Sequence, residues 1–226
     1  MTDKDLRPVW LDPWLVVLAK PCGLLSQPGL GPDLADSVIS RARRRWPGAR
    51  LVHRLDRDTT GLILLALDGE THRRLGAAFA ERRVRKTYLA RVQGVPAARG
   101  GLINQPLARI GTSPPRYGVV TVAEGGRPAL TRWRCLAASG DPAGRWRALV
   151  LQPRTGRSHQ LRAHLAWLGH PLLGDPIYGP APGERHGLAP CLQLRAVGLR
   201  FTHPQTGEVL RLRWAGPWAD LSRLAD

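Results

Sequence analysis

Short strand-like segments follow one another along most of this chain, without regularly alternating helices between them. Residues 14–19 and 62–67 are unbroken apolar runs typical of buried strands, and residues 86–92 alternate apolar and polar side chains. Further strand-like segments lie at 130–136, 146–151, 192–201 and 209–214. A doubly wound parallel sheet requires a regular βαβ alternation. The pattern therefore predicts an α+β fold with a largely antiparallel or mixed central sheet, flanked by helices and loops.

Three segments carry helix signals. Apolar residues recur every four positions over residues 34–46, and Pro47-Gly48 would end that helix. Asp68 is a candidate N-cap for a second helix that extends to about residue 83. Leucines at helical spacing predict a third helix over residues 161–168, ended by Gly169.

The length of 226 residues fits one domain. The segment 94–128 is rich in glycine and proline and is expected to form loops with short strands, and 171–183 is expected to be a turn-rich loop. We find no internal repeat. We therefore expect one domain over residues 1–226, in which residues 1–13 form an N-terminal extension.

The charge is strongly one-sided. The chain has 34 basic residues against 17 acidic ones, a net charge of +17, and all but three of the basic residues are arginines. A GC-rich coding sequence would explain the preference for arginine over lysine, but not the excess of basic residues. A phosphate backbone fits this charge. A membrane-surface role fits less well, because no basic amphipathic segment has a strong apolar face.

The three cysteines, Cys22, Cys135 and Cys191, are far apart and form no CxxC pair. They exclude a disulfide framework and a thiolate zinc site. Residues 1–10 contain no apolar stretch typical of a signal peptide. The two longest apolar runs have six residues each, whereas a membrane span needs about 20. We expect a soluble protein of the cytoplasm.

The densest polar segment is residues 51–61, where His53, Arg54, Asp56, Arg57 and Asp58 fall within six positions. Such a loop is either solvated surface or a site on a rigid scaffold, and the apolar segments on both sides favour the second reading. An aspartate among arginines is held ionised. An ionised aspartate acts as a nucleophile or stabilises an oxocarbenium-like sugar.

A second polar segment covers residues 152–164 and continues at 174–179. His159 and His164 are five positions apart with no glutamate between them, which is not zincin spacing. The HxE…PCxxC pattern of zinc deaminases and the P-loop pattern are both absent from the sequence. Within these two polar segments only Asp56 and Asp58 lie close together, which is a poor carboxylate set for two-metal chemistry. The sequence therefore predicts no metal site.

These segments resemble the motifs of the RluA family of pseudouridine synthases. Residues 15–29 (LVVLAKPCGLLSQPG) are similar to the family's opening motif, and residues 53–61 (HRLDRDTTG) to its catalytic HRLDxxTSG motif. Residues 85–94 are similar to the KxYxAxVxG segment, and 156–164 with 174–178 to the last long motif. The matches follow the family's order and cover roughly residues 14–214.

The resemblance implies an RNA pseudouridine synthase fold and activity, with no cofactor. It implies that Asp56 is the catalytic aspartate, that Tyr88 stacks near the target uracil, and that Arg162 pairs with Asp56. Spacing alone would also allow Tyr88 in a core and Arg162 on a helix surface.

The same resemblance suggests residues that contact RNA. Arg54 matches an arginine that enters the RNA stack as the target base leaves. The other candidates around the two motifs are His53, Arg57, Arg157, His159 and Gln160. Apart from the resemblance, the basic charge suggests phosphate contacts, with a merely solvated helix face as the alternative; the candidates are Arg41, Arg43, Arg44, Arg45, Arg82 and Arg83.

The chain also departs from the family pattern. The family often has Leu-His-Ala where this chain has Leu194-Arg-Ala196, and we expect no S4 RNA-binding domain. Residues 23–29 and 36–39 resemble the dual-specificity RluA subgroup, which acts on the tRNA anticodon loop and on 23S rRNA. A TruC-like enzyme specific for tRNA is the alternative within the family. A non-catalytic RNA-binding or ribosome-assembly factor and an RNA N-glycosidase are alternatives outside it. We expect a monomer.

Overall fold

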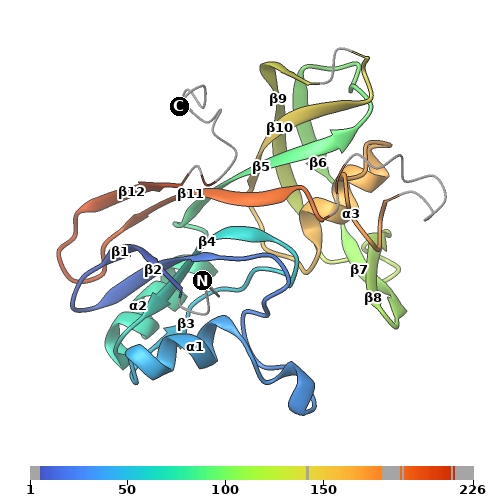
Figure 1. The fold of residues 1–226 in the computed structure, drawn as a ribbon. Helices are drawn as coiled ribbons and strands as arrows, with labels where there is room; N and C mark the ends of the chain where they lie inside the picture. The colour runs from blue at the N-terminus through green and yellow to red at the C-terminus, as the bar shows by residue number, and fades with distance from the viewer. Residues whose placement is uncertain (1–5, 141–142, 180–188, 190, 215, 217–226) are drawn as a thin grey trace. The chain divides into compact units, whose positions relative to one another are not determined.

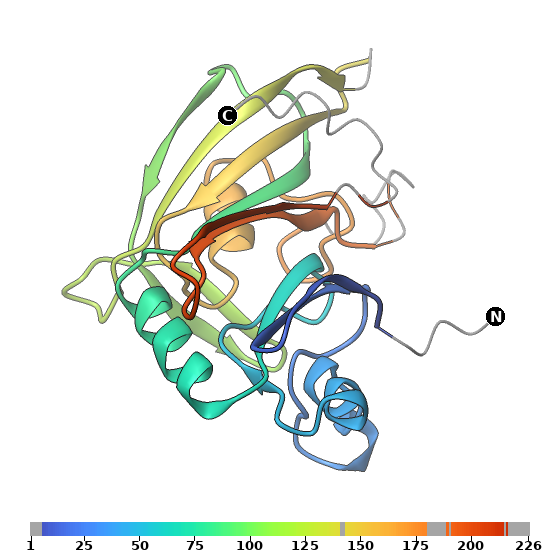
Figure 2. The same cartoon turned by 90° about the vertical axis from the view of Figure 1, so that its left-hand side faces the viewer.

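The structure, a computed structural model, describes residues 6–140, 143–179, 189, 191–214 and 216. The chain divides into two compact units. Among the described residues, the first unit comprises those within 6–86 and 195–216, and the second comprises those within 87–194. Figure 1 labels the helices and strands of both units, and Figure 2 shows the same ribbon turned by 90°.

The strands of the first unit form a mixed sheet. Their order is β1 (Pro8–Leu11), β2 (Leu15–Lys20), β4 (Thr60–Ala66), β11 (Leu194–Thr202) and β12 (Val209–Arg213). The short β3 (Arg50–Leu51) pairs with the end of β4. Strands β2 and β4 are antiparallel, as are β11 and β12, whereas β11 runs parallel to β4. The predicted α+β class with a mixed sheet is confirmed.

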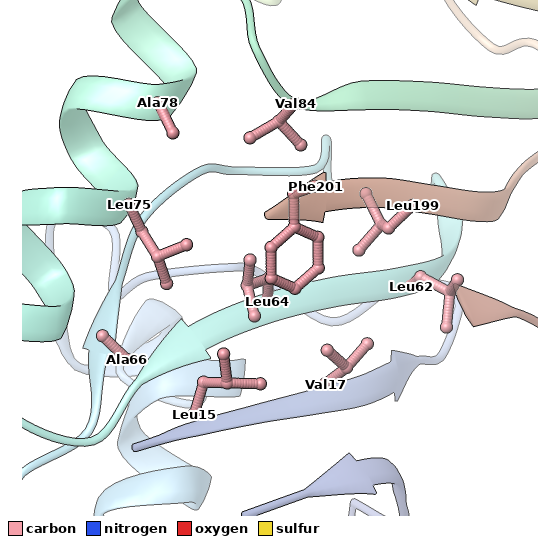
Figure 3. Packing of buried hydrophobic residues seen from close by; sticks show 10 residues of the cluster. All are labelled: Leu15, Val17, Leu62, Leu64, Ala66, Leu75, Ala78, Val84, Leu199 and Phe201. Atoms are coloured by element: carbon pink, nitrogen blue, oxygen red, sulfur yellow. The ribbon is translucent and has the colours of Figure 1, made fainter. Parts of the chain in front are cut away.

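A continuous core lies between this sheet and helix α2 (Gly69–Ala80). Alternate residues of each strand point into it, as expected for period-2 side chains (Figure 3). The buried members are Leu15, Val17, Leu62, Leu64, Ala66, Leu75, Ala78, Val84, Leu199 and Phe201. Asp68 caps α2 as predicted, because its Oδ1 accepts the N–H of Thr71 at 2.8 Å. The helix ends a little earlier than residue 83.

Helix α1 (Val38–Arg45) begins later than its periodicity suggested. Ser37 is the N-cap and forms a reciprocal capping box with Ser40, which fixes the start of the helix. The preceding Pro32–Leu34 is a separate turn of 3₁₀ helix, η1. Three arginines occupy the last turn, where the helix dipole favours positive charge.

The second unit contains an antiparallel sheet, a hairpin and one helix. The sheet order is β5 (Arg85–Gln93), β10 (Trp146–Pro153), β9 (Leu130–Gly140) and β6 (Gly100–Asn104). Strands β7 (Leu107–Thr112) and β8 (Pro115–Val119) form the hairpin, so the glycine-rich segment does contain short strands.

Helix α3 (Gln160–Trp167) packs on the base of this hairpin. Ala163 of the helix lies in one buried cluster with Leu107, Ala129 and Tyr178. Gly169, with a φ of +84°, follows the helix as predicted. The expected loop at 171–183 is turn-rich through residue 179, and its last four residues lie outside the described ones. No helix in the described ranges is long and apolar enough to cross a membrane.

Candidate active site

The loop that carries Asp56 connects β3 to β4 in the first unit, and it is attached to the segment that follows β2. The hydroxyl of the buried Ser26 accepts the N–H of Leu55 at 3.0 Å and donates to the Leu55 carbonyl at 2.7 Å. Asp56 follows directly and is half-buried, and its carbonyl accepts the N–H of Thr59 in a tight turn. The backbone on both sides of Asp56 is therefore fixed.

Lys20, at the end of β2, provides a second attachment for the same loop. Its side chain is 1% exposed, and its ammonium donates to three backbone carbonyls, those of Pro21, Leu24 and Arg57. Burial lowers the pKa of Lys20 to about 8, and the negative charges of Cys22, Asp58 and Asp56 partly offset that effect. A buried ammonium with three acceptors ties the opening motif to the catalytic motif.

His53 begins the catalytic motif and holds the loop against β4. Its Nε2 accepts the N–H of Leu64 at 3.0 Å, and its ring stacks on Phe79 with centroids 4.8 Å apart. Burial lowers the pKa of His53 to about 3, and the charge of Lys86 lowers it further. The imidazole is therefore neutral, and its contacts are with Leu64 and Phe79 of the protein. These contacts indicate a structural role for His53 instead of the expected RNA contact.

Gly61 ends the motif at a point where two strands approach closely. Its φ is +108°, and a Cβ there would lie 2.1 Å from the Ala196 carbonyl oxygen. Thr60 lies opposite Arg195 in the parallel pairing of β4 with β11. Arg195, which replaces the family's usual histidine, is 6% exposed, and its guanidinium lies 5.1 Å from the ring centroid of Trp214. Arg195 is thus a packed residue beside the motif.

The predicted RNA-contacting arginines of the first unit differ in their surroundings. Arg54 and Arg57 are exposed on the catalytic loop, and Arg57 Nε donates to the Gly23 carbonyl. Arg41 and Arg83 are engaged in ion pairs with Asp36 and Glu81. Four further arginines are exposed, and for them no ion pair is seen among the described residues: Arg43, Arg44, Arg45 and Arg82.

Two of those exposed arginines are oriented by their neighbours. Arg43 Nε donates to the carbonyl of Ala49, and the guanidinium of Arg45 lies 4.7 Å from the ring centroid of Trp46. These arginines leave the end of α1 strongly basic, as a phosphate-binding surface requires.

In the second unit, Arg162 lies on α3 and is 3% exposed. It forms a bidentate ion pair with Asp175: Nε donates to Oδ2 at 2.8 Å and Nη2 to Oδ1 at 2.7 Å. In the sequence, Asp175 stands out only as part of the last motif, and no role was expected of it. The sequence signal for Asp175 is the Gly174-Asp-Pro-Ile-Tyr178 segment, which predicts a turn that contains a carboxylate. This signal does not reveal which residue the carboxylate pairs with.

Tyr178 joins the helix start to the β7–β8 hairpin. Its hydroxyl lies 3.1 Å from His159 Nδ1 and accepts the N–H of Tyr117 at 2.8 Å. His159 has a φ of +52° and makes edge contacts with both tyrosine rings. Arg157 is half-buried, and its Nε donates to the Pro128 carbonyl.

Gln160 is 4% exposed, and its amide makes four hydrogen bonds inside the protein. Its oxygen accepts from the Thr155 hydroxyl and the Arg157 N–H, and its nitrogen donates to the Leu130 carbonyl and the Thr131 hydroxyl. These bonds use the full capacity of the amide. The expected RNA contact by Gln160 does not fit this arrangement, because the residue is a structural one.

Tyr88 lies on β5, opposite Leu151 of β10, and is 8% exposed. The predicted catalytic residues therefore belong to both units: Asp56 to the first, Tyr88 and Arg162 to the second. In the described ranges, no three His, Cys, Asp or Glu side chains gather in a way that could hold a metal ion.

Comparison with known proteins identifies the class. The family model described as RNA pseudouridylate synthase matches residues 14–167, which is more than half of the chain. Among solved structures, the chain is similar to human RNA Pseudouridylate Synthase Domain Containing 1, with a TM-score of 0.78 and 30% identity over 95% of this chain and 84% of the other. Human RNA Pseudouridylate Synthase Domain Containing 4 is also similar, with a TM-score of 0.70 and 27% identity over 92% of this chain and 87% of the other. The chain belongs to the RNA pseudouridylate synthase family.

Curated relatives show that, within this family, the chain is of the RluA type. The dual-specificity RNA pseudouridine synthase RluA of Salmonella typhi is 42% identical over 211 residues, covering 89% of this chain and 93% of the relative. The enzyme of the same name from Pasteurella multocida (strain Pm70) is 43% identical over 209 residues, with 92% of each chain covered. The chain is an RNA pseudouridine synthase, an isomerase that acts on RNA. The non-catalytic and glycosidase alternatives are not favoured.

Proposed function

We propose that this enzyme isomerises one uridine in each of two RNAs, a tRNA anticodon stem-loop and 23S rRNA, with Asp56 as the catalytic carboxylate. The observation that carries the proposal is its 42% identity, over 89% of the chain, to enzymes named dual-specificity synthases. An anchored loop that presents a half-buried carboxylate supports the assignment of Asp56.

The reaction breaks the N1–C1′ bond of uridine, turns the base, and joins C5 to C1′. The proton lost from C5 is balanced by one gained at N1, so the reaction needs no redox partner or group donor. The Asp56 carboxylate either attacks C1′ or stabilises elimination to a glycal. Tyr88 would hold the uracil and receive the C5 proton. Arg162 would hold the Asp56 carboxylate in the position that the reaction requires.

The target base must first leave its stack, which costs a few kcal/mol. Arg54 is exposed on the catalytic loop, and its planar guanidinium would stack in the gap and offset part of this cost. Arg43, Arg44 and Arg45 would bind phosphates near the end of α1. Arg57, Arg82 and Arg157 are secondary candidates of the same kind. We propose further that the enzyme acts as a monomer in the cytoplasm.

The experiment is tritium release from RNA labelled at C5 of uridine, with purified enzyme and no added metal or nucleotide. Transcripts of tRNA and of 23S rRNA are assayed separately. Release from both supports the proposal. Release from tRNA alone replaces it with a TruC-like specificity. No release from either, despite tight binding, contradicts it. Free uracil in the medium would indicate a glycosidase.

A further inference from the structure

Arg162 is buried and pairs with Asp175, a residue to which the proposed reaction gives no role. Arg162 lies within Gln160–Leu165, a run of α3 in which every residue is buried. A guanidinium in such a place needs a charged partner, because removing an ion from water is costly. Asp175, which is fully buried, is that partner in the second unit.

The contact between them is directional. Two parallel N–H···O bonds of 2.8 and 2.7 Å connect the Nε–Nη2 edge of Arg162 to the two oxygens of Asp175. A bidentate pair fixes the plane of the guanidinium as well as its position. The ring of Tyr178 lies alongside, with its centroid 5.1 Å from the guanidinium carbon, which further restricts rotation of that plane.

Asp175 is also held in place by contacts other than that with Arg162. Its Oδ1 also accepts the backbone N–H groups of Ile177 at 2.9 Å and Tyr178 at 3.1 Å. Gly174, just before it, has a φ of +67°, and a Cβ there would lie 2.1 Å from the Cys191 carbonyl oxygen. The turn is therefore built around the carboxylate, so that Asp175 imposes its geometry on Arg162.

We infer that Asp175 is a positioning residue that acts on the reaction through Arg162; this rests on the proposed role of Arg162. Since Asp175 occupies the Nε–Nη2 edge, a second carboxylate would be received on the opposite edge, at Nη1. Since the negative charge of Asp175 offsets part of the positive charge of the guanidinium, Arg162 contributes through direction more than through net charge.

The test is a double-mutant cycle of Asp175→Asn and Arg162→Ala, read by single-turnover tritium release and by the dissociation constant for the same RNA. Asparagine retains Oδ1 for the turn and for Nη2, but its amide cannot accept from Nε. We expect Asp175→Asn to slow the reaction at least tenfold with RNA affinity within about twofold. In the Arg162→Ala background, Asp175→Asn should have no further effect on the rate.

Controls separate this role from general stability. Asp12→Asn removes a carboxylate that pairs with His203 and caps β2 in the first unit, and it should lower the melting temperature without slowing the reaction. Where Asp175→Asn fails to fold, Arg162→Lys takes its place. Lysine keeps the charge but cannot form the bidentate pair, so we expect a loss within about threefold of that in Arg162→Ala.

The outcomes are distinct. A wild-type rate in Asp175→Asn, or in Arg162→Lys, while Arg162→Ala is slow, overturns the inference and leaves the proposed function intact. A wild-type rate in Arg162→Ala overturns the proposed role of Arg162 and the inference with it. Additive effects in the double variant also overturn the inference, because Asp175 would then act by another route.

Discussion

The hydroxyl group of Ser26 makes two hydrogen bonds to the backbone of Leu55, one to its N–H and one to its carbonyl oxygen. The Ser26 side chain thus satisfies both backbone polar groups of Leu55, as a neighbouring strand does in a sheet. Leu55 is the residue directly before Asp56. The opening motif therefore supports the catalytic motif from 29 positions away in sequence.

Ser26→Ala should lower turnover about tenfold with little change in RNA affinity, because a small displacement of a reacting group is costly. Ser40→Ala is the matched control. It also removes one serine hydroxyl, from the capping box of α1, and should cost about 1 kcal/mol of stability without slowing turnover. Single-turnover rates and thermal unfolding of both variants check this. Equal rates for the wild type and Ser26→Ala would contradict it.

Gly61→Ala should destabilise the first unit by more than about 2 kcal/mol, because the new methyl group meets the backbone of β11 and the φ is unfavourable. Gly76→Ala is the control: nothing lies within 4 Å of an added Cβ there, and the change should add up to about 1 kcal/mol to the stability of α2. Denaturant unfolding measures both. Similar midpoints for the two variants would show that the close approach of β4 and β11 is unimportant.

His53 gives a pH dependence whose sign follows from its pKa of about 3, lowered chiefly by burial from an unfolded value near 6.5. Between these pH values the unfolded chain binds a proton that the folded one does not. Stability from this group is complete above pH 6.5 and is lost as the pH falls toward 3. His53→Gln retains an acceptor for the Leu64 N–H and should flatten this acid limb, as measured by urea unfolding from pH 7 to pH 4. An unchanged acid limb would contradict the assignment.

The sequence was sufficient to predict seven strands in chain order, the Asp68 cap, the glycine that follows α3 and the family motifs. Each of these depends on local signals. The sequence did not predict β1, which lies in the expected N-terminal extension, or the short β3. The sequence was also not sufficient to predict the ion pair between Arg162 and Asp175. The two residues are 13 positions apart, and the pair forms only where α3 packs against the turn that follows it. Sequence reasoning also placed Gln160 and His53 among RNA contacts, since a motif shows that a polar residue matters but not whether it faces inward.

Reversing Arg43 and Arg44 to glutamate should weaken RNA binding and reduce the slope of log affinity against log salt by about 1 to 2, roughly one unit for each phosphate that is no longer neutralised. The control reverses Arg73 and Arg74 on α2, which pair with Glu70, and gives the same change in net charge. Titrations at several salt concentrations compare the two. Equal slopes in both double variants would mean that only net charge matters and that the end of α1 is merely solvated.

The most direct test compares Asp56→Asn with Asp58→Asn in single-turnover tritium release. Both variants remove one negative charge from the same loop and conserve side-chain size. We expect Asp56→Asn to lose at least about a thousandfold in rate while it still binds RNA, and Asp58→Asn to stay within about threefold of the wild type. A wild-type rate in Asp56→Asn would contradict the central claim that this carboxylate performs the isomerisation.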